Sequence, residues 1–499
     1  MAVPKVVGIE TEFGIIVRGA PDWDPVSASS LLINSYMNNM SRDAIYQNSA
    51  VAWDFVDESP GADVRDEVSE DSSPPAVETH LVNTVLTNGA RYYVDHAHPE
   101  MSSPECRDAL SVVLFDRAAE LILIDSMTAA TEGLPPGEEM IIYKDNTDRK
   151  GNAYGCHENY LLDRTIPFGQ IINAATAHFV TRQVYTGSGK VGSEWPDYDI
   201  DYQITQRAEH FEEPVGLETT LKRPIVNTRD EPHADSKKYR RLHVIAGDAN
   251  MSQVATLLKV GTSAILFAML EDGAYDRSIE FRNPVEAMHM VSHDLSLARP
   301  LELVDGRTST AIEVQWRLFE QATAWSDTYG LEAVGEECGT LVLRRWEDVL
   351  TRLEDDPLSL ANQIDWIAKR RILEGFIDRH GCEWSDQRVR ALDLQYHDLR
   401  PSKSLAARAG LERIVDDVDA KRAMTEPPRD TRAFFRGKCL QNFSGDVVAA
   451  NWDSIVFDAG DEPLRRVPML EPLRGTADHV EEILDSCNSI TELLDRLSG

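Results

Sequence analysis

The sequence predicts an α+β protein with one large domain and a small C-terminal one. Two segments, 7–14 and 88–106, alternate polar and apolar side chains as β-strands do. Long apolar stretches such as 251–271 predict helices that pack in a core. Pro427 and Pro428 end a stretch of mixed charge and mark a linker, and 499 residues suffice for a large core. We therefore expect domains at 1–425 and 426–499.

Each of the two strand segments has ionisable side chains on one of its faces. Their polar residues are Glu10 and Glu12 in VGIETEFG, and Arg91, Tyr93 and Asp95 in RYYVD, with Glu100 just past that strand. A solvated strand face is the ordinary explanation of such alternation. However, apolar residues surround the two glutamates and predict a central strand, where carboxylates without cations are costly. The pattern therefore favours a cradle for Mg²⁺ and a polyphosphate.

The remaining elements follow in order along the chain. Segment 54–79 is rich in Asp, Glu, Ser, Gly and Pro, which predicts a long mobile acidic loop near the site. Strands are expected at 140–144, within 184–246 and in NWDSIVFD. Helices are expected at 26–42, 104–130, 167–183, 251–271, 310–326, 345–378 and 476–498.

A glycine-rich stretch, VYTGSGKVG, lacks the context of a nucleotide motif. Gly187, Gly189 and Gly192 have the dinucleotide-binding spacing, but SEWPDYD follows instead of an opening helix. Val191 follows Lys190 where a P-loop requires Ser or Thr. We interpret this stretch as a flexible loop.

Several further side chains are candidates with open alternatives. His157, in CHENY, fits a metal or phosphate role as well as a structural hydrogen bond. Trp452 fits either the core or stacking on an adenine, and Arg432 is placed to reach phosphates or an acidic partner. Within 222–250, cations such as Arg229 and Arg240 flank apolar residues, which indicates a buried anion partner.

Bulk properties exclude several classes of function. The formal net charge of −34 disfavours nucleic-acid binding. No apolar run reaches membrane-spanning length, and the N-terminus lacks a secretory signal pattern. The six cysteines are dispersed without a CxxC pair, so we expect a reducing cytoplasm and no zinc or disulfide framework.

Taken together, the motifs resemble the Pup ligase and depupylase family, which attaches and removes the prokaryotic ubiquitin-like protein Pup. The resemblance spans nearly the whole chain and rests on VGIETEFG, LTNGARYYVDHAHPEMSSPEC, GNAYGCHENYL, TRQVYTGSGKVG, VNTRDEPHAD, RRLHVIAGDANMS and LDLQYHDLR. VGIETEFG is closer to the ligases. The insertion at 43–79 and VDHAHPE resemble the depupylases, and we weigh the insertion more heavily.

The resemblance implies a glutamine-synthetase-like large domain, with a curved antiparallel sheet backed by helices, and a small C-terminal domain. It implies a hydrolase that deamidates the C-terminal glutamine of Pup and cleaves Pup–lysine isopeptide bonds. ATP and Mg²⁺ would be bound cofactors, with pupylated proteins as substrates and a link to the bacterial proteasome. The alternatives are a Pup–protein ligase that consumes ATP and a non-catalytic Pup-binding module.

The roles implied for individual residues follow the matching motifs. Asp95 is the expected catalytic base or nucleophile. The expected metal ligands are Glu10, Tyr93 and Glu100, with Glu12 and His157 as additions. The expected ATP-binding residues are Arg91, Ser103, Trp452 and Arg432. Acidic Pup needs a local basic groove, for which we expect Arg207, Arg229, His233, Arg240 and His243.

Overall fold

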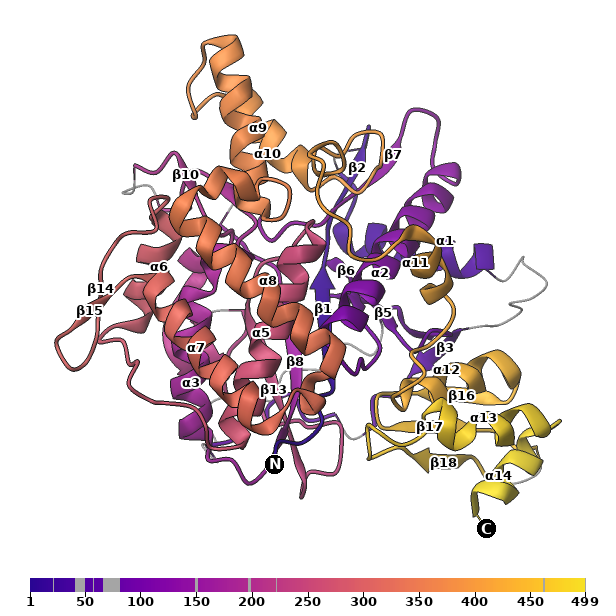
Figure 1. Cartoon of the computed structure of the whole chain (residues 1–499). Helices are drawn as coiled ribbons and strands as arrows, with labels where there is room; N and C mark the ends of the chain where they lie inside the picture. Colours follow the sequence, from indigo (N-terminus) through magenta and orange to yellow (C-terminus); the bar gives the residue numbers. More distant parts are fainter. Residues whose placement is uncertain are drawn as a thin grey trace.

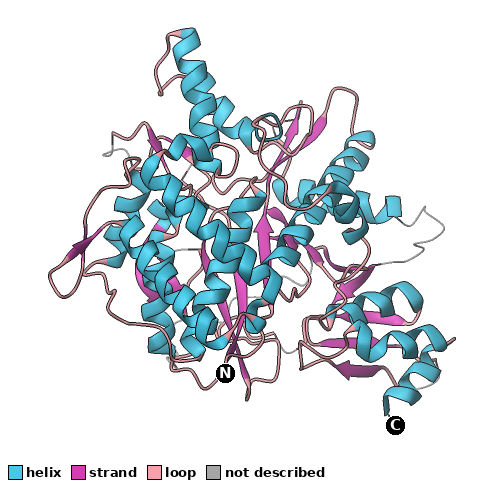
Figure 2. Cartoon of the chain, in the orientation of Figure 1, coloured by secondary structure: helices cyan, strands magenta, loops and turns pink. Residues whose placement is uncertain are grey.

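The computed structural model describes residues 1–20, 22–40, 50–56, 58–65, 81–148, 151–195, 199–220, 222–460 and 463–498. Its helices and strands form a mixed α+β architecture, which confirms the predicted fold class (Figures 1 and 2). A ten-stranded sheet runs through the molecule, and helices cover it. All six cysteines lie in the described part and are unpaired.

The sheet has the strand order β13-β8-β1-β6-β5-β4-β3-β16-β17-β18. Neighbouring strands are antiparallel except β3 and β16, which pair in parallel. The strands are β1 (Val7–Glu12), β3 (Ala50–Trp53), β4 (Asn83–Leu86), β5 (Arg91–Asp95), β6 (His98–Ser102), β8 (Cys156–Asp163), β13 (Tyr239–Gly247), β16 (Val447–Ala450), β17 (Ser454–Phe457) and β18 (Arg465–Pro468). Four two-stranded pairs complete the strands: β2 (Gly14–Arg18) with β7 (Glu139–Tyr143), β9 (Lys190–Val191) with β10 (Tyr202–Gln203), β11 (Phe211–Gly216) with β12 (Arg223–Asn227), and β14 (Leu301–Glu302) with β15 (Thr308–Ser309).

The main core lies between the sheet and the helices of the large body. Ile9, Leu242 and Val244 of the sheet share this core with apolar side chains of α2 and α5. The helices are α1 (Pro25–Met40), α2 (Ala109–Glu132), α3 (Phe168–Thr181), α4 (Gln183–Thr186), α5 (Gln253–Glu271), α6 (Pro284–His293), α7 (Ala311–Tyr329), α8 (Glu336–Asp355), α9 (Asp365–His380), α10 (Gln387–Tyr396), α11 (Asp417–Ala423), α12 (Ala433–Asn442), α13 (Ala477–Ser486) and α14 (Ile490–Ser498).

Helix α5 is apolar on all sides, as the sequence predicts for 251–271. It begins at the Ser252 cap, whose hydroxyl accepts a hydrogen bond from the amide of Ala255. Among the described residues, it is the one helix long and apolar enough to cross a membrane. However, 94% of its most apolar window is buried inside the protein, as a core helix requires.

Local structure differs from the sequence prediction at several places. Glu100 lies within a strand, β6, because residues 91–102 form a hairpin instead of one strand. Helix α2 begins after the Asp108 cap, whose side chain accepts from Ser111 N. The stretches 345–378 and 476–498 each divide between two helices, α8 with α9 and α13 with α14.

The glycine-rich stretch is packed, which makes the flexible-loop interpretation wrong. Gly187 and Gly189 are buried, and a Cβ atom on either would lie 2.3 Å from Ile204 O or 2.0 Å from the Tyr202 hydroxyl. Glycine is therefore required at both positions because neighbouring segments of the chain approach the backbone too closely for a Cβ atom.

Part of segment 43–79 forms a strand of the ten-stranded sheet. Strand β3 opens its described portion, and the amide of Val64 donates to Thr228 O at 3.0 Å. Residues 41–49 and 66–80 lie outside the described residues, so the expected mobility of 43–79 stays a prediction.

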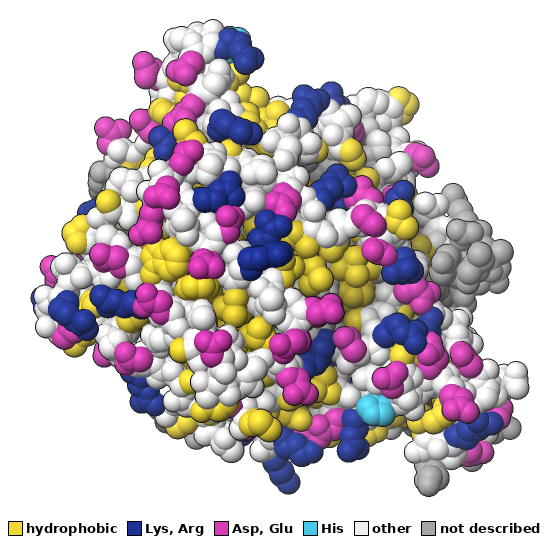
Figure 3. Space-filling view, viewed as in Figure 1, with side chains coloured by type: hydrophobic (Ala, Val, Ile, Leu, Met, Phe, Trp, Pro, Cys, Tyr) yellow, Lys and Arg dark blue, Asp and Glu magenta, His cyan; other side chains and the backbone are white. Residues whose placement is uncertain are grey.

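The C-terminal helices α12, α13 and α14 pack with β16 and β17 around a second core (Figure 1). That core also contains Val51, Trp53 and Val85 from the N-terminal part of the chain. The boundary expected near residue 425 stays a prediction. On the face of the molecule seen in Figure 3, acidic and basic side chains are interspersed.

Candidate active site

Polar side chains of five neighbouring strands lie on one face of the sheet, which we call the polar face. Directly paired residues of antiparallel strands point to the same face. Glu10 pairs with both Ser102 and His157, and Glu100 pairs with both Glu12 and Tyr93. This polar face therefore brings together the predicted residues Glu10, Glu12, Arg91, Tyr93, Asp95, Glu100, His157 and His243.

Three carboxylates form a cluster on the polar face. Oxygen atoms of Glu12, Asp95 and Glu100 lie within 4.8 Å of one another. Burial raises the pKa of Glu100 well above its ordinary value, and the negative charges of Asp95 and Glu12 raise it further. Burial and the charge of Glu100 likewise raise the pKa of Tyr93. Such mutual repulsion is relieved by a divalent cation, so these oxygen ligands fit Mg²⁺.

Asp95 is the most accessible of the clustered acids. Its side chain is 40% exposed, whereas Glu12 and Glu100 are buried. Burial opposes ionisation of Asp95, but the hydrogen bond and charge of His96 and the charges of His157 and Arg91 lower its pKa overall. Asp95 is therefore an ionised carboxylate at the rim of the cluster, placed to meet a substrate.

A pocket opens at the start of β1, beside the polar face. The space it encloses, counted together with the solvent at its mouth, is about 570 Å³. Ser103, Arg432, Trp452, His233 and Glu10 are among its lining residues. The buried Ser102 hydroxyl, also in the lining, has no hydrogen-bond partner in the described part of the chain. Three of the four predicted ATP-binding residues thus share one pocket.

Arg91, the fourth predicted ATP-binding residue, is held between two aromatic rings. Its guanidinium carbon lies 3.9 Å from the ring centre of Trp53 and 4.0 Å from that of Tyr93. Its Nε donates to Asn83 at 3.0 Å. Trp53 in turn meets Trp452 edge to face at 5.3 Å. The arginine is therefore fixed beside the aromatic wall of the pocket, with its terminal nitrogens available for an anion.

Arg432 reaches the pocket from the C-terminal part but already has an anionic partner. Its Nε donates to Glu105 at 2.7 Å and its Nη1 to Met469 O at 2.7 Å. Arg436 also pairs with Glu105, and the charges of the two arginines lower the pKa of this buried acid to about 2. Arg432 therefore lines the pocket, but two of its guanidinium nitrogens, Nε and Nη1, already donate to partners within the protein.

The predicted substrate-binding residues are divided among several places. His233 lines the pocket, and His243 lies against Glu10 and His157 on the polar face. Burial lowers the pKa of His243 and of Arg241, and the charge of the partly exposed Arg229 adds to this lowering. Arg207 is buried, and its Nη1 donates to the backbone oxygen of Ile245 in β13 at 2.6 Å.

Arg240 is not in the site, and its neighbour Arg241 is. Arg240 donates to Ile166 O at 2.9 Å and stacks over Phe168, on the other face of β13. Arg241 points to the polar face and donates to Asn159 Oδ1 at 2.6 Å. The prediction of Arg240 is corrected because successive strand residues face opposite sides, and only Arg241 shares the side of His243.

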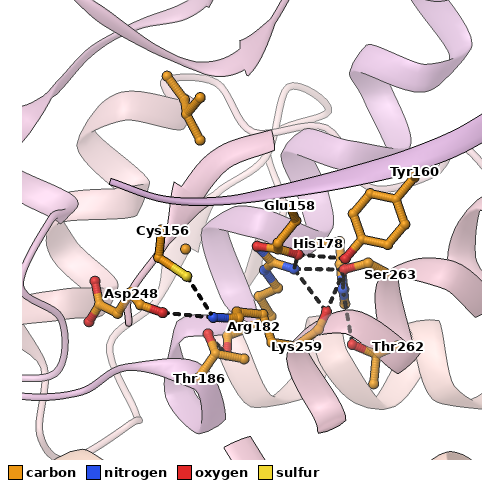
Figure 4. Close-up of polar contacts among 12 residues, drawn as sticks. Cys156, Glu158, Tyr160, His178, Arg182, Thr186, Asp248, Lys259, Thr262 and Ser263 are labelled. Atoms are coloured by element: carbon orange, nitrogen blue, oxygen red, sulfur yellow. Dashed lines mark hydrogen bonds and ion pairs between the residues drawn. The ribbon is translucent and has the colours of Figure 1, made fainter. Parts of the chain in front are cut away.

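A buried ionic network fixes β8 from behind the polar face (Figure 4). Glu158 and Arg182 form an ion pair at 2.5 Å, and Arg182 also donates to Ser263 at 2.6 Å. Lys259 donates to Asp248 O at 2.8 Å and contacts Cys156 Sγ at 3.3 Å. Because Glu158 alternates with His157 and Asn159, anchoring it fixes the side chains that face the site.

Two residues of the site were not expected from the sequence. The amide of Gly155 donates to Glu12 Oε1 at 2.8 Å, and the Trp53 ring lies against Arg91. Neither residue has a period-two signal, because both roles depend on contacts with distant segments.

The chain is similar to known proteins that all refer to Pup in their names or descriptions. A family model described as Pup-ligase protein matches residues 5–456. A protein of Acidothermus cellulolyticus named depupylase is 48% identical over 99% of both chains. One of Mycolicibacterium smegmatis, named Pup deamidase/depupylase, is 41% identical over 99% of this chain and 100% of that protein. The solved complex between prokaryotic ubiquitin-like protein Pup and its ligase PafA matches with a TM-score of 0.80 and 28% identity, over 99% of this chain and 95% of that chain.

Proposed function

The chain belongs to the Pup-ligase protein family, and from this we propose that it is a hydrolase acting on Pup. It deamidates the C-terminal glutamine of Pup and cleaves the isopeptide bond between Pup and lysines of pupylated proteins. Full-length relatives named depupylase and Pup deamidase/depupylase support this activity. Its partners are then Pup and pupylated proteins, with a functional link to the bacterial proteasome.

The structural observation that carries the proposal is the accessible, ionised Asp95 beside buried carboxylates. As a general base, Asp95 takes a proton from water as the water oxygen attacks the carboxamide carbon. As a nucleophile, it attacks that carbon itself and forms an anhydride, which water then hydrolyses. In both cases ammonia or a lysine amine leaves with a proton, and no phosphoryl transfer is needed.

The cofactors we propose are ATP and Mg²⁺. Glu10, Tyr93 and Glu100 would hold Mg²⁺, with Glu12 and His157 as further ligands. Arg91, Ser103 and Trp452 would hold the nucleotide. Bound Mg²⁺ supplies positive charge that offsets the repulsion among the buried carboxylates. Arg229, His233 and His243 would contact the substrate.

The test is incubation with Pup ending in glutamine and Mg-ATP, with ammonia and nucleotides followed together. Ammonia release without matching ADP is the expected result. The structural likeness to a Pup ligase makes ligation the second candidate. ATP consumed only with Pup ending in glutamate and a lysine-bearing protein, with no ammonia released from the glutamine form, would establish the ligase instead. Pup binding with neither reaction would indicate a non-catalytic module.

A further inference from the structure

The turn between β5 and β6 has a left-handed backbone at a residue that is not glycine. His96 has a φ of 52°, and it directly follows Asp95, the last residue of β5. This region is unfavourable for residues with a Cβ atom, and such conformations cluster at functional sites where the surrounding structure holds them. Here the Ser29 hydroxyl of α1 donates to Ala97 O at 3.0 Å, and Asp95 pairs with His98 across the hairpin. A glycine would avoid the strain, so a histidine at this position requires an explanation.

The side chain of His96 contacts the carboxylate of Asp95. Its Nδ1 lies 3.1 Å from Oδ1 of Asp95. Because an ionised carboxylate only accepts hydrogen bonds, the imidazole is the donor and Nδ1 carries a proton. The neutral ring can make this bond as well as the charged one, since it also has one N–H group. Among the described residues, no other side chain forms a hydrogen bond or an ion pair with the Asp95 carboxylate.

Packing does not explain the imidazole of His96. Its side chain is 67% exposed, so its removal costs the core little. The other histidine of the hairpin, His98, is engaged elsewhere, because its Nδ1 contacts Phe13 O at 3.1 Å and its ring stacks on Tyr154. The contact with Asp95 is therefore specific to His96 and lies at the open rim of the carboxylate cluster.

From this geometry we propose that His96 is a positioning residue for the reaction of Asp95. By donating to Oδ1, the imidazole fixes the rotation of the carboxylate and leaves its second oxygen to meet water or the substrate carbon. A carboxylate without this bond rotates among several orientations, of which only some are productive. This inference rests on the proposed function, which assigns the reaction to Asp95. The strained turn is then the means by which the strand delivers a donor to its own last residue.

The test compares three variants of the full-length protein with wild type, using Pup ending in glutamine and Mg-ATP. Ammonia release gives kcat and the KM for Pup. His96→Gly removes the imidazole and suits the left-handed backbone, so its melting temperature should be unchanged or higher. Its kcat should fall on the order of 10²-fold, the effect of a misplaced reacting group, while the KM for Pup stays the same.

His96→Asn is the conservative rescue. Asparagine tolerates a positive φ, and its amide nitrogen corresponds in position to Nδ1 of histidine and donates in the same way. This variant should therefore recover most of the kcat that His96→Gly loses. Ala97→Gly is the matched control, because it loosens the same turn but retains the imidazole. It should keep the wild-type kcat.

The inference is overturned if His96→Gly has the wild-type kcat, if His96→Asn is as slow as His96→Gly, or if Ala97→Gly is equally slow. A raised KM with unchanged kcat would also overturn it, because His96 would then bind Pup and not orient Asp95. A wild type that releases no ammonia contradicts the proposed function itself, and the inference with it. An active wild type with an equally active His96→Gly variant contradicts the inference alone.

Discussion

A Cβ atom on Gly155 would lie 2.2 Å from Nε2 of His157. The same atom would lie 2.8 Å from Oε1 of Glu12, which accepts a hydrogen bond from the amide of Gly155. A side chain at position 155 and the observed position of the imidazole are therefore incompatible. The absence of that side chain lets His157 and Glu12 lie together on the polar face.

Gly155→Ala should therefore lower Pup deamidation by about 100-fold, because displacing a site residue by about 1 Å has effects of that size. The chain should remain folded, since the clash is with a side chain that can move. Ammonia release from Pup ending in glutamine is the measurement. Gly169→Ala, in α3, is the control, because a Cβ there meets nothing within 4 Å. Full activity of the Gly155 variant would show that the position of His157 is unimportant.

Asp95→Asn should lower turnover by about 10²–10⁴-fold, the usual contribution of an acid–base group, while ATP still binds. Ammonia release and ATP calorimetry separate the two effects. Asp305→Asn, in the exposed turn between β14 and β15, is the matched control and should retain activity. An Asp95 variant that turns over at the wild-type rate would rule out both proposed roles of this carboxylate.

Trp452→Leu should weaken ATP binding by roughly tenfold, since stacking of a base on an aromatic ring is worth about 1–3 kcal/mol. Trp452 lines the pocket and contacts Trp53. Equilibrium titration with ATP is the measurement. Trp316→Leu on α7 is a control for loss of a tryptophan elsewhere, because Trp316 bonds only to Glu354 among the described hydrogen bonds. Equal ATP affinity in both variants would place the adenine away from Trp452.

Substitution of the two neighbouring arginines of β13 should affect deamidation differently. Arg241→Gln should reduce deamidation at least about tenfold, because Arg241 orients Asn159 and contacts Glu231. Arg240→Gln removes the same charge from the other face and should leave kcat unchanged. Steady-state kinetics of the two variants checks this contrast. Equal losses would mean that net positive charge matters more than position.

Glu105→Gln should destabilise the fold by about 3–5 kcal/mol at pH 7, since it leaves two buried arginines without their carboxylate. The folded-state pKa of Glu105, about 2, lies below its ordinary value of 4.5. Its stabilisation is therefore complete above pH 4.5 and is lost as the pH falls toward 2. Urea unfolding of wild type and of the Glu105→Gln variant measures the free energy of unfolding of each across this pH range. The difference between the two free energies should shrink below pH 4.5. If this difference in free energy did not change with pH, the ion pairs of Glu105 would not be what stabilises the wild type.

Much of the polar face was predictable because strand geometry is local. The alternation of Glu10 with Glu12, and of Arg91 with Tyr93 and Asp95, assigns each set to one side without any knowledge of the fold. The same alternation places Arg241, and not Arg240, on the side of His243. That this side of β13 belongs to the polar face follows only from the pairing of His243 with Asn159 of β8.

The less predictable parts depend on contacts between distant segments. Glu100 reaches the cluster through the β5–β6 hairpin, whose turn lies at His96, a residue with a positive φ of 52°. Trp53 reaches Arg91 because β3 joins the sheet next to β4. Neither contact leaves a periodic pattern in the sequence.

The parallel pairing of β3 with β16 has a consequence for how the protein is made. Ala450 pairs with Trp53, and the amide of Asp54 donates to Ala450 O at 2.9 Å. The pocket lining likewise combines residues from the beginning of the chain with residues from near its end. A chain synthesised only as far as residue 400 contains every acid of the cluster but lacks Arg432, Trp452 and Pro472 of that lining. An unfinished chain is therefore left without the complete pocket, and a ligand that needs this part of the lining can stabilise only molecules whose synthesis is almost finished.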